Sequence, residues 1–182
     1  MVKRRLARLL AVGAAAASMT VGLRSADAKE LRMATLAPPG SGWMKVLNKG
    51  AELLKKKTEG RITIKYYPGA VQGDERDVVR KMKLGGLDGA VLTGVGLAMI
   101  VKSIRVLEMP RMFDSLEEMD YVRRKMWPYF QRKFKAKGFI LGAPGDVGFV
   151  YFMSKSPVKS MADLRKTKAW MWTDDKLVRK MY

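Results

Sequence analysis

The sequence contains neither cysteine nor histidine. Without cysteine, the chain can form no disulfide framework and no thiolate metal site. Without histidine, it can use neither Ser-His nor Cys-His catalysis, and it cannot bind zinc through imidazole. It also lacks a phosphate loop: there is no Gly-Lys-Ser/Thr, and Gly94-Val95-Gly96 is not followed by the later glycine of a dinucleotide fingerprint. We therefore predict no metal, no cofactor and no enzyme activity.

No apolar run is long enough for an ordinary membrane-spanning helix. The longest, Leu9–Leu23, has 15 residues, against about 20 for a spanning helix. Four bases precede it at positions 3–8, and Ala26-Asp27-Ala28 follows with small residues at a cleavage site. These three features are typical of a secretory signal peptide. The interpretation is export to the periplasm with cleavage after Ala28, which leaves a mature chain that is not embedded in the membrane.

Acidic residues are scarce relative to basic ones. The chain has 36 Lys and Arg against 17 Asp and Glu, and the mature part would keep a net charge of +15. The bases lie along predicted helices, with acids among them in 55–59 and 117–125, and do not form a motif with interleaved aromatics. We interpret them as solvated faces and expect no nucleic-acid partner. The alternative is a basic protein that binds nucleic acid or an anionic membrane through its net charge, with steep salt dependence.

The first hundred residues of the mature chain alternate between strand and helix signals. Each predicted strand ends in a loop rich in Gly or Pro, and helices begin near Ser41 and Asp74. Strands joined by helices of ten or more residues pair in parallel, so the predicted fold class is α/β. Ligand sites of such sheets lie beyond the carboxyl ends of the strands. The predicted strands are 31–36, 61–67 and 87–92, and the predicted site loops are 37–42, 69–73 and 93–96.

The second half of the chain has weaker signals. Residues 115–137 have a helical pattern that we expect Pro128 to divide. Three short apolar stretches, at 139–142, 148–153 and 169–172, predict further strands. A short helix is expected within 157–168, and Thr173-Asp174-Asp175 would cap a last helix.

Four joined stretches resemble the solute-binding subunits of TRAP transporters, the DctP-like extracytoplasmic family. They are Met33 to Trp43, Gly60 to Arg76, Met82 to Gly89 and Pro157 to Leu164. The resemblance implies a two-lobed, type II periplasmic-binding-protein-like fold that closes around a small organic solute and delivers it to a membrane permease.

The resemblance also implies a division of the chain. Residues 29–144 would form the first α/β lobe, 145–156 a strand crossing the hinge, and 157–182 only the start of a second lobe. Members of the family are about twice as long, so we expect a C-terminally truncated chain. A non-functional fragment is therefore an alternative to an active binding protein.

The same resemblance directs attention to two tryptophans. Many members hold a carboxylate solute with an arginine on the strand after an Asp-Leu-Lys-Gly-like turn, and the matching position here is Trp170. A second basic position, after the Gly-Phe pair at the hinge, is here Val150. Trp170 and Trp172 would instead favour an apolar, aromatic or polyol-like solute over a simple dicarboxylate. Core packing of one or both tryptophans is the alternative.

Further candidate residues come from the strand-end loops and the hinge. For each of them, core packing, a helix-terminal charge or a turn role is an equal alternative. These candidates are Thr35, Trp43, Glu75, Thr93, Phe149 and Tyr151. An enzyme would need a convergent set, and the nearest is Ser154-Lys155, whose adjacent side chains point to opposite faces of an extended segment.

Overall fold

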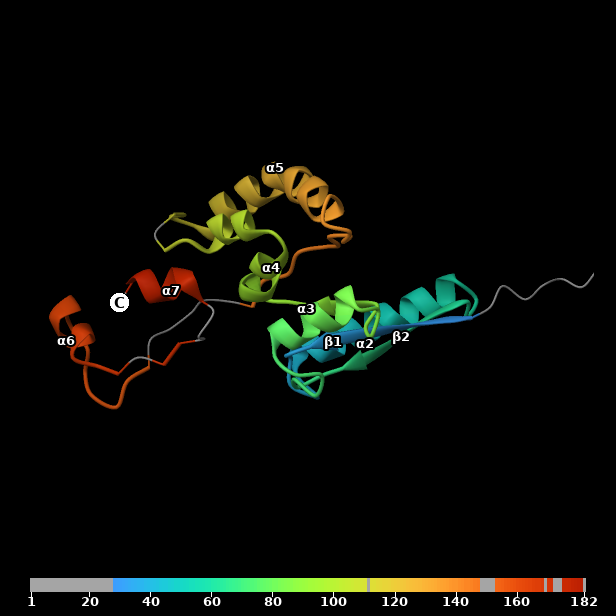
Figure 1. Ribbon diagram of the computed structural model, residues 1–182, viewed down its shortest axis with the longest axis horizontal. Helices are drawn as coiled ribbons and strands as arrows, with labels where there is room; N and C mark the ends of the chain where they lie inside the picture. Colours follow the sequence, from blue (N-terminus) through green and yellow to red (C-terminus); the bar gives the residue numbers. More distant parts are fainter. Residues whose placement is uncertain (1–27, 111, 148–152, 169, 172–174, 182) are drawn as a thin grey trace, which may run out of the picture.

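The computed structural model describes residues 28–110, 112–147, 153–168, 170–171 and 175–181 (Figure 1). At its centre is a parallel sheet in the order β2-β1-β3, with β1 paired to both neighbours. The predicted α/β class and the three predicted strands of the first hundred residues are confirmed. The strands are β1 (Lys29–Thr35), β2 (Ile62–Tyr67) and β3 (Gly89–Val91).

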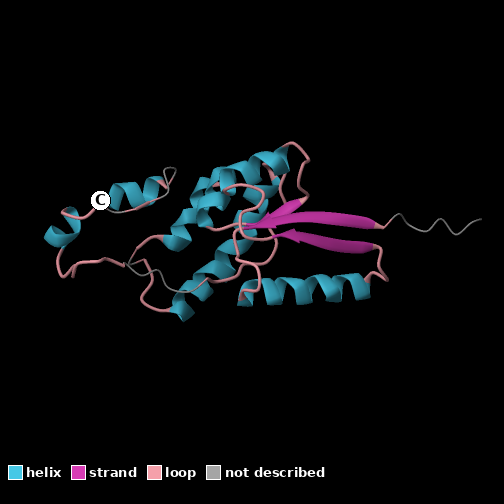
Figure 2. Ribbon diagram, turned by 90° about the horizontal axis from the view of Figure 1, so that it is seen from below, coloured by secondary structure: helices cyan, strands magenta, loops and turns pink. Residues whose placement is uncertain are grey.

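Two helices cover opposite faces of this sheet, as Figure 2 shows. On one face α3 (Glu75–Lys83) buries Val78 against Ala34 of β1 and Leu87. On the other, α2 (Gly42–Lys57) lies along β2 and buries Met44. Burying such apolar side chains stabilises the fold by about 1.5–3 kcal/mol each, which fixes the helices on the sheet.

Side-chain caps begin the helices where the sequence predicts them. The Ser41 hydroxyl accepts the backbone N–H of Met44, and the Asp74 carboxylate accepts those of Arg76 and Asp77. Each bond satisfies an N–H group that has no partner within the helix. Local sequence therefore determines where α2 and α3 start.

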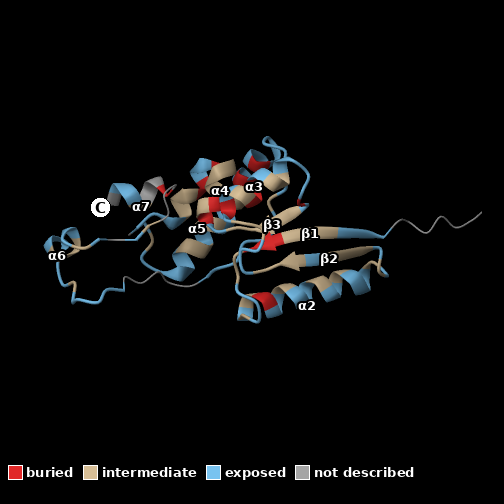
Figure 3. Ribbon diagram, turned by 60° about the horizontal axis from the view of Figure 1, so that its bottom comes forward, coloured by how far each residue is buried: buried red, intermediate tan, exposed pale blue. Residues whose placement is uncertain are grey.

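A second core, separate from the sheet, is built from helices. It joins α4 (Gly94–Ile100), a 3₁₀ helix η1 (Lys102–Glu108) and α5 (Leu116–Lys135). Phe130 and Phe134 of α5 are almost fully buried against Val101 and Ile104. In Figure 3 buried segments, drawn in red, lie among partly buried and exposed ones in the region of α4 and α5. The 3₁₀ helix had no counterpart among the sequence predictions.

The prediction that Pro128 divides the long helix is wrong. Helix α5 runs without interruption from Leu116 to Lys135 and contains Pro128 in its interior. A proline there removes one backbone hydrogen bond and costs about 3 kcal/mol in an isolated helix. Pro128 lies on the exposed side of α5, while Phe130 and Phe134 anchor the other side in the core. Tertiary packing thus outweighs the local effect of proline.

The strand predicted at 139–142 is also wrong. Residues 139–147 form an irregular segment, and Ile140 is 97% exposed. A strand requires a hydrogen-bonded neighbour, and here the carbonyls bond to α5 side chains instead. The Trp127 indole donates to the carbonyl of Gly142 at 3.1 Å. Gln131 donates in the same way to the carbonyl of Leu141.

The remaining predictions concern the end of the chain. Most of the strands expected at 148–153 and 169–172 lies outside the described residues, and Met153, Trp170 and Met171 are in no strand. The expected short helix is α6 (Met161–Arg165), and the last helix is α7 (Lys176–Met181). Asp175 caps α7 by accepting the N–H of Val178. None of the helices within the described ranges has the length and apolarity to cross a bilayer.

Candidate functional site

The carboxyl ends of the three strands lie side by side. Ala34 is in register with Tyr67, and Thr35 is in register with Val91. Because β1 is central, the chain passes from β1 through α2 to β2 on one side, and then through α3 back across β1 to β3 on the other side. Such a reversal opens a crevice between the loops at the carboxyl ends of the strands, where ligands bind in this class of sheet.

Backbone hydrogen bonds join the first two loops at this edge. The N–H of Gly69 donates to the carbonyl of Ala37 at 2.9 Å, and the N–H of Ala70 donates to Thr35 at 3.4 Å. Thr35 is buried, and its hydroxyl accepts the N–H of Ala37 at 3.1 Å. Gly69 has φ of +66°, a conformation that favours glycine. The loops predicted at 37–42 and 69–73 thus form one unit.

Glu75 joins the third loop to this unit. Its carboxylate is buried and accepts the N–H of Thr93 at 2.5 Å, the Thr93 hydroxyl at 2.7 Å and the N–H of Gly96 at 2.8 Å. A Cβ atom on Gly96 would lie 2.9 Å from the carboxyl carbon of Glu75, so only glycine permits this approach. The structure therefore brings the candidates Thr35, Glu75 and Thr93 to one edge, and among these three only Thr93 is exposed.

Behind that edge lies a cluster of charges that sequence reasoning missed. Arg105 has its Nε 3.2 Å from Glu108, and it donates from Nη2 to both carboxylate oxygens of Asp175 at 3.1 Å. Burial raises the pKa of Glu108 above its ordinary value, while the positive charge of Arg105 acts in the opposite direction. Asp175 is 70 residues from Arg105 in sequence, so no local pattern could have revealed this pair. The bond ties α7 to the helical core.

Trp43 lies where the chain returns to this edge. A Cβ atom on Gly145 would lie only 2.3 Å from the Trp43 ring, so the ring packs directly on the backbone of Gly145. Asp146 accepts a hydrogen bond from Arg123 of α5, which holds the same segment. Gly145 is the first residue of the predicted hinge, and Trp43 thus contacts the predicted hinge.

The other candidates lie at the far end of the chain. Trp170 is 75% exposed in an irregular stretch, and Phe149, Tyr151 and Trp172 lie outside the described residues. The Ser154 hydroxyl accepts the N–H of Ser156, a local turn interaction on an exposed segment. Within the described ranges no three acidic side chains are close enough to hold a metal ion.

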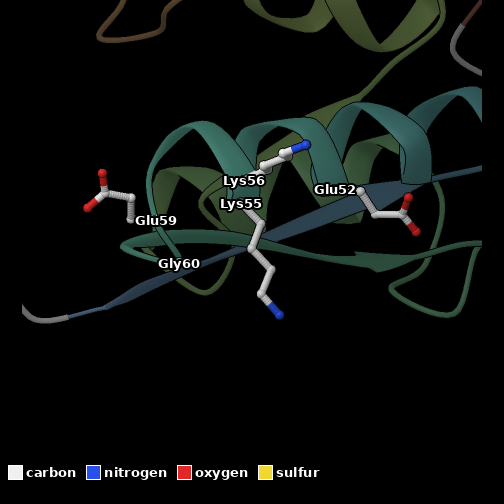
Figure 4. A pocket seen from close by; sticks show the side chains of 5 residues that line it. All are labelled: Glu52, Lys55, Lys56, Glu59 and Gly60. Carbon is white, nitrogen blue, oxygen red and sulfur yellow. The ribbon is translucent and has the colours of Figure 1, made fainter.

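A hollow of about 470 Å³ lies elsewhere, at the end of α2 opposite to the candidate site. Figure 4 shows that its charged side chains, Glu52, Lys55, Lys56 and Glu59, point outward and away from one another. It lies beside the amino end of β2, because α2 starts at the carboxyl edge of β1 and ends at Lys57. Its open, dispersed geometry does not define a binding site.

Residues 33–172 match the DctP family, the bacterial extracellular solute-binding proteins of family 7. The match covers most of the chain, and the chain belongs to this family. A curated solute-binding protein of Chromohalobacter salexigens is 34% identical over 95 residues, which are 52% of this chain and 28% of that protein. The chain thus spans only about a third of the length of the relatives it matches.

Solved structures show the same relationship. A TRAP periplasmic solute-binding protein of Chromohalobacter salexigens with bound D-glucuronate is 30% identical, with a TM-score of 0.54, over 59% of this chain and 36% of that one. One of Roseobacter denitrificans with bound L-galactonate is 25% identical, with a TM-score of 0.55, over 60% and 37% of the two chains. The fold class predicted from the sequence, that of the two-lobed periplasmic binding proteins, is confirmed.

Proposed function

We propose that this chain is the extracytoplasmic solute-binding component, or part of it, of a TRAP-type secondary transporter. It captures a small organic solute and delivers it to the membrane permease subunits. The observation that carries the proposal is the set of strand-end loops joined by hydrogen bonds, from Ala70 to Thr35 and from Thr93 to Glu75, in a chain of the DctP family. Preformed loops suit reversible capture because little ordering is required on binding.

The proposed place of action is the periplasm. The family is extracellular by description, and residues 1–28 have the three parts of a signal peptide with cleavage after Ala28. Export also accounts for the absence of nucleotide-binding motifs. The measurement is the N-terminal sequence of the protein recovered from the periplasmic fraction, which should begin at Lys29.

The candidate residues divide into two roles in this proposal. Thr93, which is exposed, and Trp43, which is partly exposed, would contact the solute. Thr35 and Glu75, which are buried and fully engaged in loop contacts, would hold the loops in place. Phe149, Tyr151, Trp170 and Trp172 would supply the opposite wall, as the resemblance implies.

The solute class follows from Trp170. An exposed indole offers a ring face to an apolar or polyol-like solute and cannot fork onto a carboxylate as arginine does. Relatives in solved structures hold the sugar acids D-glucuronate and L-galactonate. We propose that the solute of this chain carries no such dominant carboxylate and is a neutral polyol or an aromatic compound.

Calorimetric titration of the protein against matched pairs of solutes tests this proposal. D-Glucuronate is paired with neutral glucose, and L-galactonate with neutral galactitol. We expect a neutral solute to bind better than its acid. Trp170→Arg should reverse this order and shift the ratio of the two affinities by about tenfold to a hundredfold, since a charge-assisted pair contributes about 1.5–3 kcal/mol. Trp170→Gln, which removes the ring without adding a charge, is the control. A folded protein that binds none of these solutes, and no member of an aromatic panel, would contradict the proposal.

A further inference from the structure

Helix α5 presents one fixed face to the protein and another to solvent. Phe130 is fully buried and Phe134 is 2% exposed, both packed on Val101 and Ile104. Met126 and Trp127 pack against the same core. Because these residues recur at helical spacing, the opposite side of α5 is held outward. In Figure 1 α5 forms the outer edge of the molecule, away from the sheet.

The outward side is strongly basic. After Glu117 and Glu118 in the first turn, the only further acidic residue of α5 is Asp120, which pairs with Arg123. In the described part of the structure, five exposed bases of this helix form no ion pair, whereas Arg123, which is largely buried, pairs with Asp120 and Asp146. We call these five bases the basic face: Arg124, Lys125, Arg132, Lys133 and Lys135.

Two tyrosines accompany the basic face. Tyr121 is 56% exposed and Tyr129 is 38% exposed. The ammonium group of Lys125 lies 5.5 Å from the centre of the Tyr121 ring, and that of Lys133 lies 5.4 Å from that of Tyr129. A ring with a polar tip beside a cation suits a boundary between water and an apolar phase.

We propose that the basic face of α5, with Tyr121 and Tyr129, docks on a membrane surface that contains anionic phospholipid. Phosphate headgroups are the complementary charge, and a helix face pre-formed on a rigid core needs no folding to bind them. This function goes beyond solute capture, because it would hold the protein at the membrane that contains its permease. The choice of lipid over nucleic acid depends on the proposed export from the cytoplasm and on the two exposed tyrosines, each of which has a lysine ammonium group beside its ring, an arrangement suited to the membrane boundary.

Sedimentation with vesicles of equimolar phosphatidylglycerol and phosphatidylcholine tests the proposal, with pure phosphatidylcholine vesicles as the neutral reference. The protein used is the predicted mature chain from Lys29, so that the apolar segment 9–23 does not contribute. The test variant replaces three bases of the basic face by glutamine, and the control variant replaces three exposed bases of α2. The two sets are Arg124, Lys125, Arg132 and Lys45, Lys49, Lys56.

Each base near an anionic surface contributes about fivefold in binding, so the test variant should bind about a hundredfold more weakly than the parent. The control variant, with the same net charge, should lose much less. Binding of the parent should also weaken steeply with added salt. Equal losses in the two variants would overturn the proposal, because they would show that net charge alone is responsible. Absence of binding to the anionic vesicles by a folded parent would overturn it too.

A label on α5 separates lipid from nucleic acid. Because the chain has no cysteine, Pro128→Cys provides a single attachment point for an environment-sensitive dye at the centre of the exposed side. Its emission should shift to the blue with anionic vesicles, while the same dye on Asn48→Cys in α2 should not respond. Duplex DNA that displaces the protein from vesicles, and binds it with the same dependence on the basic face, would assign the surface to nucleic acid and reject the lipid proposal.

Discussion

The replacement Glu75→Ala should destabilise the protein strongly, because it leaves three donors without an acceptor. These are the N–H groups of Thr93 and Gly96 and the Thr93 hydroxyl, bound at 2.5, 2.8 and 2.7 Å. A buried donor that loses its partner costs about 1–3 kcal/mol. The hydroxyl can turn to water, and water can reach the space that the side chain leaves, so we expect a total of about 2–4 kcal/mol.

Urea unfolding followed by circular dichroism measures this loss. For a chain of this size the same loss lowers the melting temperature by about 5–15 °C. Glu75→Gln should give an intermediate value, since its amide oxygen accepts one bond while its NH₂ group faces a donor. Glu52→Ala, an exposed acid on α2, is the matched control and should change stability by less than about 0.5 kcal/mol. If Glu75→Ala behaves like Glu52→Ala, the carboxylate does not join the loops as described.

Four further predictions concern packing, helix propensity, pH and the corrected strand. Gly96→Ala should destabilise by about 1–3 kcal/mol, because its Cβ would overlap Glu75. Gly50→Ala, in open space within α2, should stabilise by about 0.5–1 kcal/mol in the same urea assay. The backbone N–H and guanidinium of Arg32 lower the pKa of Asp88. Ionised Asp88 therefore stabilises the fold above the pKa that it has in the unfolded chain, and this stabilisation is lost as the pH falls through its pKa in the folded protein. Asp88→Asn should therefore lower stability at neutral pH and have no effect once Asp88 is protonated; an equal effect at both pH values would disprove this. Ile140→Ser should leave the melting temperature nearly unchanged, because Ile140 is exposed; a large loss would mean that it is buried after all.

Local signals were sufficient to predict the sheet and its two covering helices. Ser41 and Asp74 are caps that act within three residues, and the alternation in β2 and the glycines after each element are local as well. The failures came where distant contacts decide the outcome. Pro128 is tolerated because Phe134, six residues on, anchors α5 in a core built with η1. The apolar run at 139–142 forms no strand because it bonds to side chains of α5.

The candidate site was predictable in its location but not in its internal bonds. The rule for parallel sheets correctly brings Thr35 and Thr93 to one edge. The sequence could mark Glu75 only as an acid at a helix start. Its true partners, 18 and 21 residues away, depend on the packing of α3 against α4. The pair of Arg105 and Asp175 is more distant still and has no sequence signal.

Amide correlation spectra of the protein, recorded during titration with the neutral solutes and sugar acids named above, test the central claim directly. A solute that binds at the carboxyl edge of the sheet should shift the amides of Gly94 and Gly96, the amides of the loop 36–41 and the indole signal of Trp43. The amide signals of α2 residues beyond the first turn should stay unchanged and serve as the internal reference. Shifts confined to these loops are the result that the account predicts. Saturable shifts that instead cluster around Lys55 and Glu59, or solute binding that leaves the strand-end loops unmoved, would contradict it.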